Sequence, residues 1–213
     1  MPAFFDRSFA FGLVFGLCVL GYFYHRADSR PPQWVGQIEA LGFTASCGSN
    51  EAEHTIFFMT SYECELCHDL YLTLHDDLRA ALETGNTQVT FVFVTPDNQL
   101  QASIFTAGQT VSRVAPEATF DFVDLMIRKH KDFNDRNTPR ELLDMIGFPS
   151  SIAPEPFNNF SQNVTQALAI FEANKLKNLP VLIVNGLRIQ GEDNEQFKAA
   201  LQAALALRKG ESS

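Results

Sequence analysis

Residues 54–83 constrain the fold of this chain more than any other segment. A short apolar run of β-forming residues, HTIFFMT, covers residues 54–60 and predicts a buried strand. A helical pattern follows, in which leucines recur at every fourth position from Leu66 to Leu82 until Gly85 and Asn86 end it. We expect this leucine stripe to lie in the core.

The rest of the chain continues the alternation of strands and helices. A second apolar run at 88–95 predicts another buried strand. A central helical block follows, with expected helices over 99–114, from Pro116 onward, from Thr138-Pro139 to Gly147, and over 157–176. Residues 178–189 predict a strand, an Asn-Gly turn and a second strand, and residues 193–208 a last amphipathic helix. This order predicts an α/β fold.

The N-terminal segment predicts a membrane anchor. Residues 8–25 carry no charged side chain, and as a helix they would span about 27 Å, just short of a bilayer core. The run is long for the apolar region of a cleaved signal peptide, and no small-residue cleavage site follows it closely. We therefore expect residues 1–30 to be a retained anchor, with a cleaved signal peptide as the alternative. Residues 31–53 are interpreted as a linker that includes one short edge strand.

Charge and cysteine content exclude two classes of protein. The 213 residues carry a net charge of −9, so binding to the phosphate backbone of nucleic acids is not expected. Four cysteines are too few for a small disulfide-stapled scaffold, and with 46% apolar residues the chain can build an ordinary core.

Cys64 and Cys67 carry the clearest chemical signal. They are spaced Cys-x-x-Cys at the start of the leucine-rich helix. The first N–H groups of a helix have no intrahelical partners and carry partial positive charge, so a cysteine thiolate is stabilised there. Cys64, nearer the helix start, is expected to attack a sulfur atom of a substrate, and Cys67 to resolve the resulting mixed disulfide.

Two other interpretations of these cysteines remain open. Cys47, Cys64, Cys67 and His68 together match a Cys3His zinc set, and the pair could also be two plain buried thiols. His68 points about 100° away from Cys67 on a helix, so we expect it to be exposed to solvent. Cys47 has no assigned partner. No separate metal site or cofactor is predicted.

Three segments together resemble the DsbA-like thiol–disulfide oxidoreductases of the thioredoxin superfamily. They are FFMTSYECELCHDLY at 57–71, the helical insertion over about 98–175, and NLPVLIVNG at 178–186. The resemblance implies a thioredoxin fold with a helical insertion over residues 54–213. It makes Cys64 the nucleophile and Cys67 the resolving cysteine.

The same resemblance implies a substrate-binding site. In this family the proline before the strand is cis and lies against the two cysteines, so Leu179–Pro180 is expected to be cis and to face Cys64. Substrates lie as an extended strand beside that segment, in the manner of β-augmentation. Leu179, Pro180 and the intervening dipeptide Glu65-Leu66 are therefore the expected substrate-binding residues.

Departures from the family pattern affect the expected redox strength. Strongly oxidising members carry Pro-His between the cysteines, whereas this chain has Glu65-Leu66, with Glu63 on the other side of Cys64. Nearby carboxylates oppose a thiolate and raise the pKa of Cys64, which predicts a weak oxidant, an isomerase or a reductase. Members often have a buried acid where this chain has Phe58. Glu63 or Glu65 would relay the proton instead, unless both are solvated surface charges.

The expected compartment follows from disulfide chemistry. An oxidising environment is required, most simply the bacterial periplasm or outer cell surface, with the chain anchored through residues 8–25. Arg26 and Arg30 after the span favour the opposite orientation by the positive-inside rule, and we give the redox chemistry more weight. The expected partners are protein thiols or disulfides and a membrane redox protein that recycles the pair. A non-catalytic adaptor is the second alternative to an enzyme.

Overall fold

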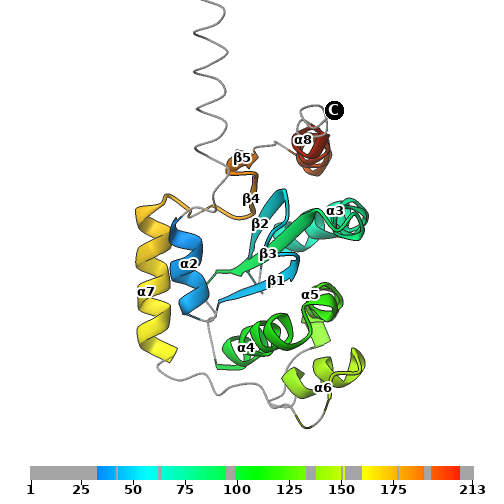
Figure 1. Cartoon of the computed structure of the whole chain (residues 1–213). Coiled ribbons are helices and arrows are strands. Elements are labelled where there is room, and N and C mark those ends of the chain that lie inside the picture. Colours follow the sequence, from blue (N-terminus) through cyan, green and yellow to red (C-terminus); the bar gives the residue numbers. More distant parts are fainter. Residues whose placement is uncertain are drawn as a thin grey trace, which may run out of the picture.

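A computed structural model gives the arrangement of most of the chain (Figure 1). It describes residues 33–41, 43–61, 64–94, 99–132, 138–149, 151, 160–176, 178–189 and 193–206. The expected membrane segment at 8–25 lies outside these residues. None of the helices within the described ranges is both long enough and apolar enough to cross a bilayer.

A five-stranded mixed sheet forms the centre of the fold, with the strand order β1-β3-β2-β4-β5. The strands are β1 (Thr44–Gly48), β2 (His54–Thr60), β3 (Thr87–Phe93), β4 (Val181–Val184) and β5 (Leu187–Ile189). β2 and β3 are parallel, and the other neighbouring pairs are antiparallel. The expected strand at 54–60 is confirmed, because four of its central residues are apolar and buried between two layers of helices.

Helices cover both faces of this sheet. α3 (Glu65–Glu83) and α8 (Asn194–Ala206) pack together on one side, and α2 (Gln33–Ala40) and α7 (Phe160–Ala173) lie side by side on the other (Figure 1). The segment between β3 and β4 is helical, as expected. Before α7 it contains α4 (Gln99–Val114), η1 (Pro116–Ala118), α5 (Thr119–Arg128), η2 (His130–Asp132) and α6 (Thr138–Met145).

The expected linker at 31–53 is corrected by the structure. Most of it belongs to the folded domain, as α2, whose buried side chains include Trp34 and Ile38, and as β1, which pairs with β3. Only the short edge strand within it was expected. An eight-residue helix is too short to show a clear apolar period in sequence, so its formation depends on burial of its apolar side chains in the core and on contact with α7.

The outer edge of β1 is covered by the helical insertion. The Ser112 hydroxyl of α4 donates to the Ser46 carbonyl at 2.7 Å and accepts from the Ser46 N–H at 2.8 Å. One side chain thus satisfies both backbone groups of a residue that an edge strand leaves unpaired. This contact fixes α4 against the sheet.

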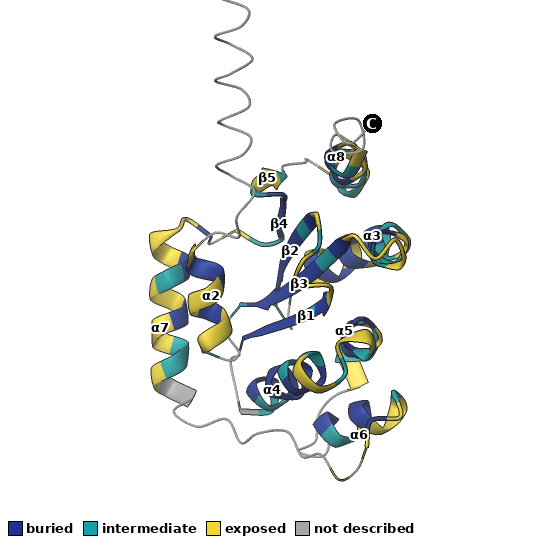
Figure 2. Ribbon diagram, viewed as in Figure 1, coloured by how far each residue is buried: buried dark blue, intermediate teal, exposed yellow. Residues whose placement is uncertain are grey.

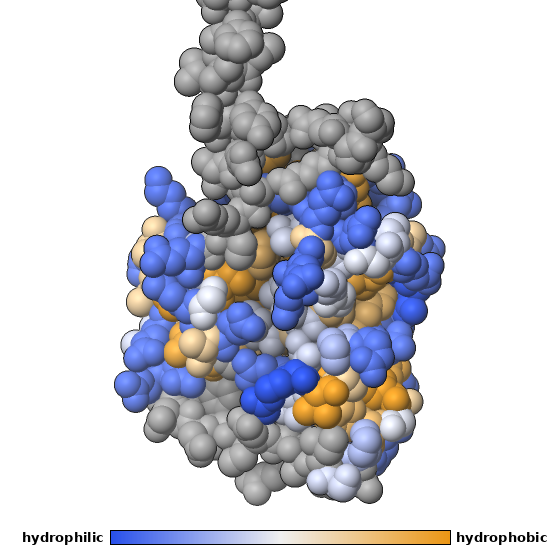
Figure 3. Space-filling model, viewed as in Figure 1, coloured by the Kyte–Doolittle hydropathy of each residue, from blue (hydrophilic) through white to orange (hydrophobic). Residues whose placement is uncertain are grey.

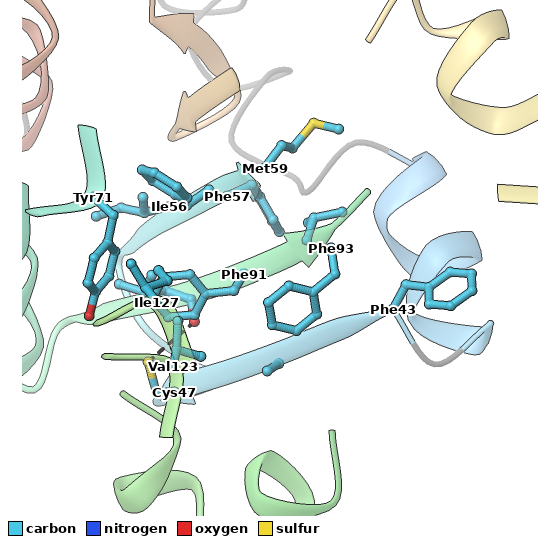
Figure 4. Packing of buried hydrophobic residues seen from close by; sticks show 14 of the residues in the cluster. Phe43, Cys47, Ile56, Phe57, Met59, Tyr71, Phe91, Phe93, Val123 and Ile127 are labelled. Carbon is cyan, nitrogen blue, oxygen red and sulfur yellow. Dashed lines mark hydrogen bonds between the residues drawn. The ribbon is translucent and has the colours of Figure 1, made fainter. Parts of the chain in front are cut away.

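Aromatic side chains fill the core beneath α3 (Figure 4), and most of β2 and β3 is buried (Figure 2). Phe58 of β2 is fully buried, with its ring centroid 6.1 Å from that of Tyr71 and 6.2 Å from that of Phe91. Tyr71 and Phe91 point toward each other between α3 and the sheet. This cluster holds α3, and therefore the two cysteines at its start, on the end of β2.

The leucine stripe is buried only in its middle. Leu70, Leu74 and Leu78 have no exposed surface, but Leu66 is 68% exposed, which corrects the expectation that the whole stripe is core. A four-residue repeat drifts by about 40° per step on a helix of 3.6 residues per turn. Leu66 and Leu82, at the two ends, are therefore turned farthest from the line that faces the sheet.

The Asn-Gly turn expected near residue 185 joins β4 to β5. Asn185 and Gly186 both have positive φ, 51° and 80°, as a two-residue type I′ hairpin requires. The Asn185 side chain accepts the N–H of Thr55 at 3.1 Å, which ties the turn to β2. The peptide bond between Leu179 and Pro180, just before β4, is cis.

Candidate active site

Cys64 and Cys67 form a disulfide at the N-terminus of α3, with their Cα atoms 5.2 Å apart. Cys64 is the N-cap residue of the helix, and its Sγ accepts the N–H of Cys67 at 3.2 Å. The Cys64 carbonyl accepts the N–H of Cys67 at 2.9 Å and that of His68 at 3.1 Å, which starts the helix. The Cys64 sulfur therefore lies at the positive end of the helix dipole.

The two cysteines differ in their access to solvent. Cys64 is half-buried, whereas Cys67 has no exposed surface. An incoming sulfur atom therefore reaches Cys64 and not Cys67. The geometry fits an attacking and a resolving role for the two residues, in that order.

The dipeptide between the cysteines lies at the surface. Leu66 is 68% exposed and presents an apolar side chain beside Cys64. The Glu65 carboxylate is also exposed, and Lys131 of η2 lies 3.6 Å from it. Because an exposed ion pair is strongly solvated, this contact only partly offsets the negative charge in the first turn.

Leu179 and Pro180 lie at the same end of the sheet as the disulfide. Met59 pairs with Val181 in the antiparallel register of β2 and β4, so Pro180, directly before Val181, lies at the end of β2 that leads to Cys64. Thr60 is the last residue of β2, four positions before Cys64. Leu179 and Pro180 are both half-buried. The register thus brings two segments together that are well over 100 positions apart in sequence.

His68 is buried, which corrects the expectation that it is exposed. Only 5% of its surface is accessible, and its ring centroid lies 4.0 Å from that of His130 in η2. Burial, and to a smaller extent nearby His130, lower the pKa of His68 to about 4, against a hydrogen bond with the Ser61 backbone that raises it. The imidazole is therefore neutral at physiological pH. The sequence contains no motif that would have paired these two histidines.

We expect the neutral His68 to make the protein less stable in acid. The unfolded chain binds a proton at His68 below about pH 6.5, whereas the folded chain resists it down to about pH 4. Between these values the free energy of unfolding falls as pH decreases, by about 2 kcal/mol from about pH 7.5 to about pH 5. Urea unfolding of the wild type and of His68→Phe measures this loss. Equal acid sensitivity of both proteins would contradict the prediction.

Cys47 does not join the other cysteines. It lies buried on β1, where its Sγ donates to the Val89 carbonyl at 3.5 Å, and burial raises its pKa to about 12 (Figure 4). Among the residues that the structure describes, no three His, Cys, Asp or Glu side chains are grouped to hold a metal ion. The set of Cys47, Cys64, Cys67 and His68 is therefore not a zinc site in this structure.

A cavity of about 810 Å³ lies between α2, α4 and the polar face of β1 and β3, away from Cys64 and Cys67. Two of its hydroxyl groups, those of Ser46 and Thr90, are bonded to each other at 2.9 Å, and that of Ser112 is bonded to the Ser46 backbone. On the face shown in Figure 3, hydrophilic side chains predominate and apolar residues form small patches. The disulfide, and neither the cavity nor these apolar patches, is therefore the candidate active site.

Comparison with known proteins agrees with this geometry. A family model described as thioredoxin matches residues 42–203, which include the sheet, both cysteines and the helical insertion. This chain belongs to the thioredoxin family. The resemblance to that superfamily noted from sequence is thereby confirmed, and the match begins at residue 42, within the segment first interpreted as a linker. No curated protein matches the sequence of this thioredoxin-family chain.

Solved structures with the same fold come from several organisms, and they include one named as a thiol-disulfide oxidoreductase. Oxidised BdbD from Bacillus subtilis aligns with a TM-score of 0.58 at 17% identity, covering 78% of this chain and 95% of its own. The catalytic domain of Proteus mirabilis ScsC gives 0.57 at 16% identity, covering 81% and 96%. MdbA from Corynebacterium matruchotii, a thiol-disulfide oxidoreductase, gives 0.61 at 12% identity, covering 76% and 87%. At these identities the similarity establishes the fold.

Proposed function

We propose that this protein is a thiol–disulfide oxidoreductase that acts on other proteins through Cys64 and Cys67. In the reducing direction, the Cys64 thiolate attacks a substrate disulfide, forms a mixed disulfide and releases one substrate thiolate. The Cys67 thiolate then attacks the Cys64 sulfur, which releases the second substrate thiolate and leaves the Cys64–Cys67 disulfide. The reverse sequence donates a disulfide to a dithiol. Each turnover moves two electrons and needs no bound cofactor.

One observation carries this proposal: the accessible Cys64 sulfur accepts a helix N-terminal N–H at 3.2 Å, beside a fully buried partner sulfur. A thiolate at that position gains both a hydrogen bond and the favourable helix dipole. The buried Cys67 is protected from other reagents until the mixed disulfide has formed. The oxidoreductase named among the structural neighbours supports the same chemistry.

The proposed substrate is an extended polypeptide segment that lies beside Leu179 and Pro180. Leu179 and Pro180 directly precede β4, at the end of the sheet that also carries the disulfide. Exposed Leu66 offers an apolar contact to the residues that flank the substrate cysteine, and Glu65 offers a charged one. Backbone pairing of the strand-addition type suits an enzyme that accepts many sequences.

We propose a weak oxidant, an isomerase or a reductase. The Glu65 carboxylate in the first turn opposes the helix dipole at Cys64, and a less stabilised thiolate gives a less oxidising disulfide. The reduction potential of the Cys64–Cys67 couple, equilibrated against glutathione, tests this directly. A value near about −120 mV would contradict the assignment, and one near about −270 mV would make the protein a reductase.

Cys67→Ser is expected to accumulate mixed disulfides with protein substrates. Without the resolving thiol, the covalent intermediate on Cys64 has no intramolecular route to release. Non-reducing electrophoresis of the full chain, mixed with a disulfide-containing protein such as insulin, would show adducts that disappear on reduction. Cys47→Ser is the matched control, because Cys47 is buried and not redox-paired, and it is expected to give none. Equal adduct levels in both variants would oppose the proposed roles.

We further propose that the protein works outside the cytoplasm, in the bacterial periplasm or at the outer cell surface, anchored through residues 8–25. One structural neighbour is named as a periplasmic thioredoxin-like protein from Salmonella enterica. A membrane redox protein would then recycle the cysteine pair. Fractionation of cells with and without residues 1–30 in the expressed chain tests the anchor.

A further inference from the structure

The helical insertion contacts the redox helix at its first turn. The η2 segment places His130 against His68, with ring centroids 4.0 Å apart, and Lys131 against Glu65 at 3.6 Å. The ion pair is exposed, whereas the His68 ring is buried at 5% accessibility. Among the described residues, the buried Nδ1 of His68 has no hydrogen-bond partner. A buried, titratable group with an unused nitrogen therefore lies one residue after Cys67, and the proposed exchange reaction does not use it.

The groups around His68 act on its charge in opposite directions. Burial and His130 of η2 disfavour the imidazolium, while the Ser61 backbone, Asp69 and Glu65 favour it. Lys131 of η2 carries a positive charge on the same side, where it pairs with Glu65. Burial is the largest of these effects, and together they place the pKa of His68 at about 4. The ring contact with His130 is part of what buries His68.

We propose that His68 and His130 are positioning residues for Cys64. Their ring contact keeps the His68 imidazole buried and neutral in the first turn of α3, so that no imidazolium stabilises the Cys64 thiolate. The inference rests on the proposed function, because it concerns the ionisation of the same nucleophile. It assigns to the helical insertion a role in limiting the reactivity of Cys64.

The shared turn explains why the charge of His68 matters to Cys64. The His68 N–H bonds to the Cys64 carbonyl at 3.1 Å, so both residues belong to the same turn of backbone. An imidazolium there would add a full positive charge to the partial charge of the helix terminus. Side chains four positions apart on a helix have their Cβ atoms about 5–6 Å apart, and an opposite charge at about that distance lowers the pKa of a thiol by about one unit. The neutral His68 withholds that stabilisation.

Two substitutions at His130 separate the ring contact from the rest of η2. His130→Ala opens the contact and exposes His68, whereas His130→Phe keeps an aromatic ring in place. In the reduced full-length protein, the rate at which iodoacetamide alkylates Cys64 is measured against pH by mass spectrometry of the Cys64 peptide. We expect alkylation in His130→Ala to be about tenfold faster than in the wild type at about pH 5.5, and His130→Phe to match the wild type.

A direct readout of His68 accompanies these rates. The imidazole resonances of His68 in NMR spectra are expected to titrate near about pH 6.5 in His130→Ala and to stay neutral to near pH 4 in the wild type. The double variant His68→Phe/His130→Ala lacks the titrating group. Its Cys64 alkylation profile is therefore expected to return to that of the wild type.

Two results would overturn the proposal. One is an unchanged Cys64 profile in His130→Ala while His68 titrates near its ordinary range. The other is the same acceleration in the double variant, which would mean that loosening of η2, and not the charge of His68, is responsible. Alkylation by iodoacetamide needs no protein substrate. A failure of the exchange reaction itself is therefore seen separately, in insulin reduction by the wild type.

Discussion

Cys64→Ser is expected to reduce catalysed insulin reduction to the uncatalysed rate, a loss of about three orders of magnitude or more. The hydroxyl that replaces the thiol neither ionises near neutral pH nor forms a disulfide, so no mixed disulfide can form. Cys67 cannot substitute for it, because its side chain has no exposed surface. Turbidity of reduced insulin, followed with dithiothreitol as the electron donor, measures the rate.

The control for this experiment is Cys47→Ser. Cys47 is a buried thiol of the same domain, and burial raises its pKa to about 12, so it contributes no nucleophile. We expect the Cys47→Ser rate to equal that of the wild type after correction for folded protein by circular dichroism. Full activity in Cys64→Ser would refute the enzyme and would favour a thioredoxin-fold adaptor that docks partners without exchanging disulfides.

Phe58→Ala is expected to lower the free energy of unfolding by about 3–5 kcal/mol. Phe58 is fully buried at the centre of the sheet, and its ring packs on those of Tyr71 and Phe91. Truncation removes apolar surface and leaves a cavity between β2 and α3 that neighbouring rings cannot fill without leaving their rotamers. Urea denaturation of the oxidised protein measures the change.

Leu72→Ala is the matched control for this loss. Leu72 lies on the outer face of α3 and is 44% exposed, so we expect a change of less than about 1 kcal/mol. A loss below about 1 kcal/mol in Phe58→Ala would mean that the core beneath the redox helix tolerates a void, contrary to the packing described. Phe58 also stands at the position where members of the resembled family often have a buried acid, and here its neighbours are aromatic rings.

Local sequence patterns predicted the strands, turns and helices correctly where a single physical requirement, such as burial or a positive φ, restricts which residues can occur. The run at 54–60 is β2 to the residue, because the central residues of a strand buried on both faces are apolar on both sides. The Asn185-Gly186 turn forms as expected, because few other pairs of residues adopt two positive φ angles. The Cys-x-x-Cys spacing placed both sulfur atoms in one helical turn, where they form a disulfide.

The predictions that the structure corrects concern residues whose burial depends on segments distant in sequence. Residues 33–40 form a helix because Trp34 and Ile38 are buried in the core and the helix contacts α7. No apolar period within this short segment predicts that burial. His68 was expected to be exposed from its angle on the helix alone, but η2 covers it.

By itself, the sequence determined the succession of strands and helices and the pair of cysteines at a helix start, because these depend on contacts between residues a few positions apart. Only the tertiary structure decided which of the two cysteines is accessible, that the strand after Pro180 pairs with the end of β2, and that the His130 ring packs on that of His68. Burial and charge at a site are sums over side chains that the fold brings together from separate segments, and no single segment of sequence contains that sum.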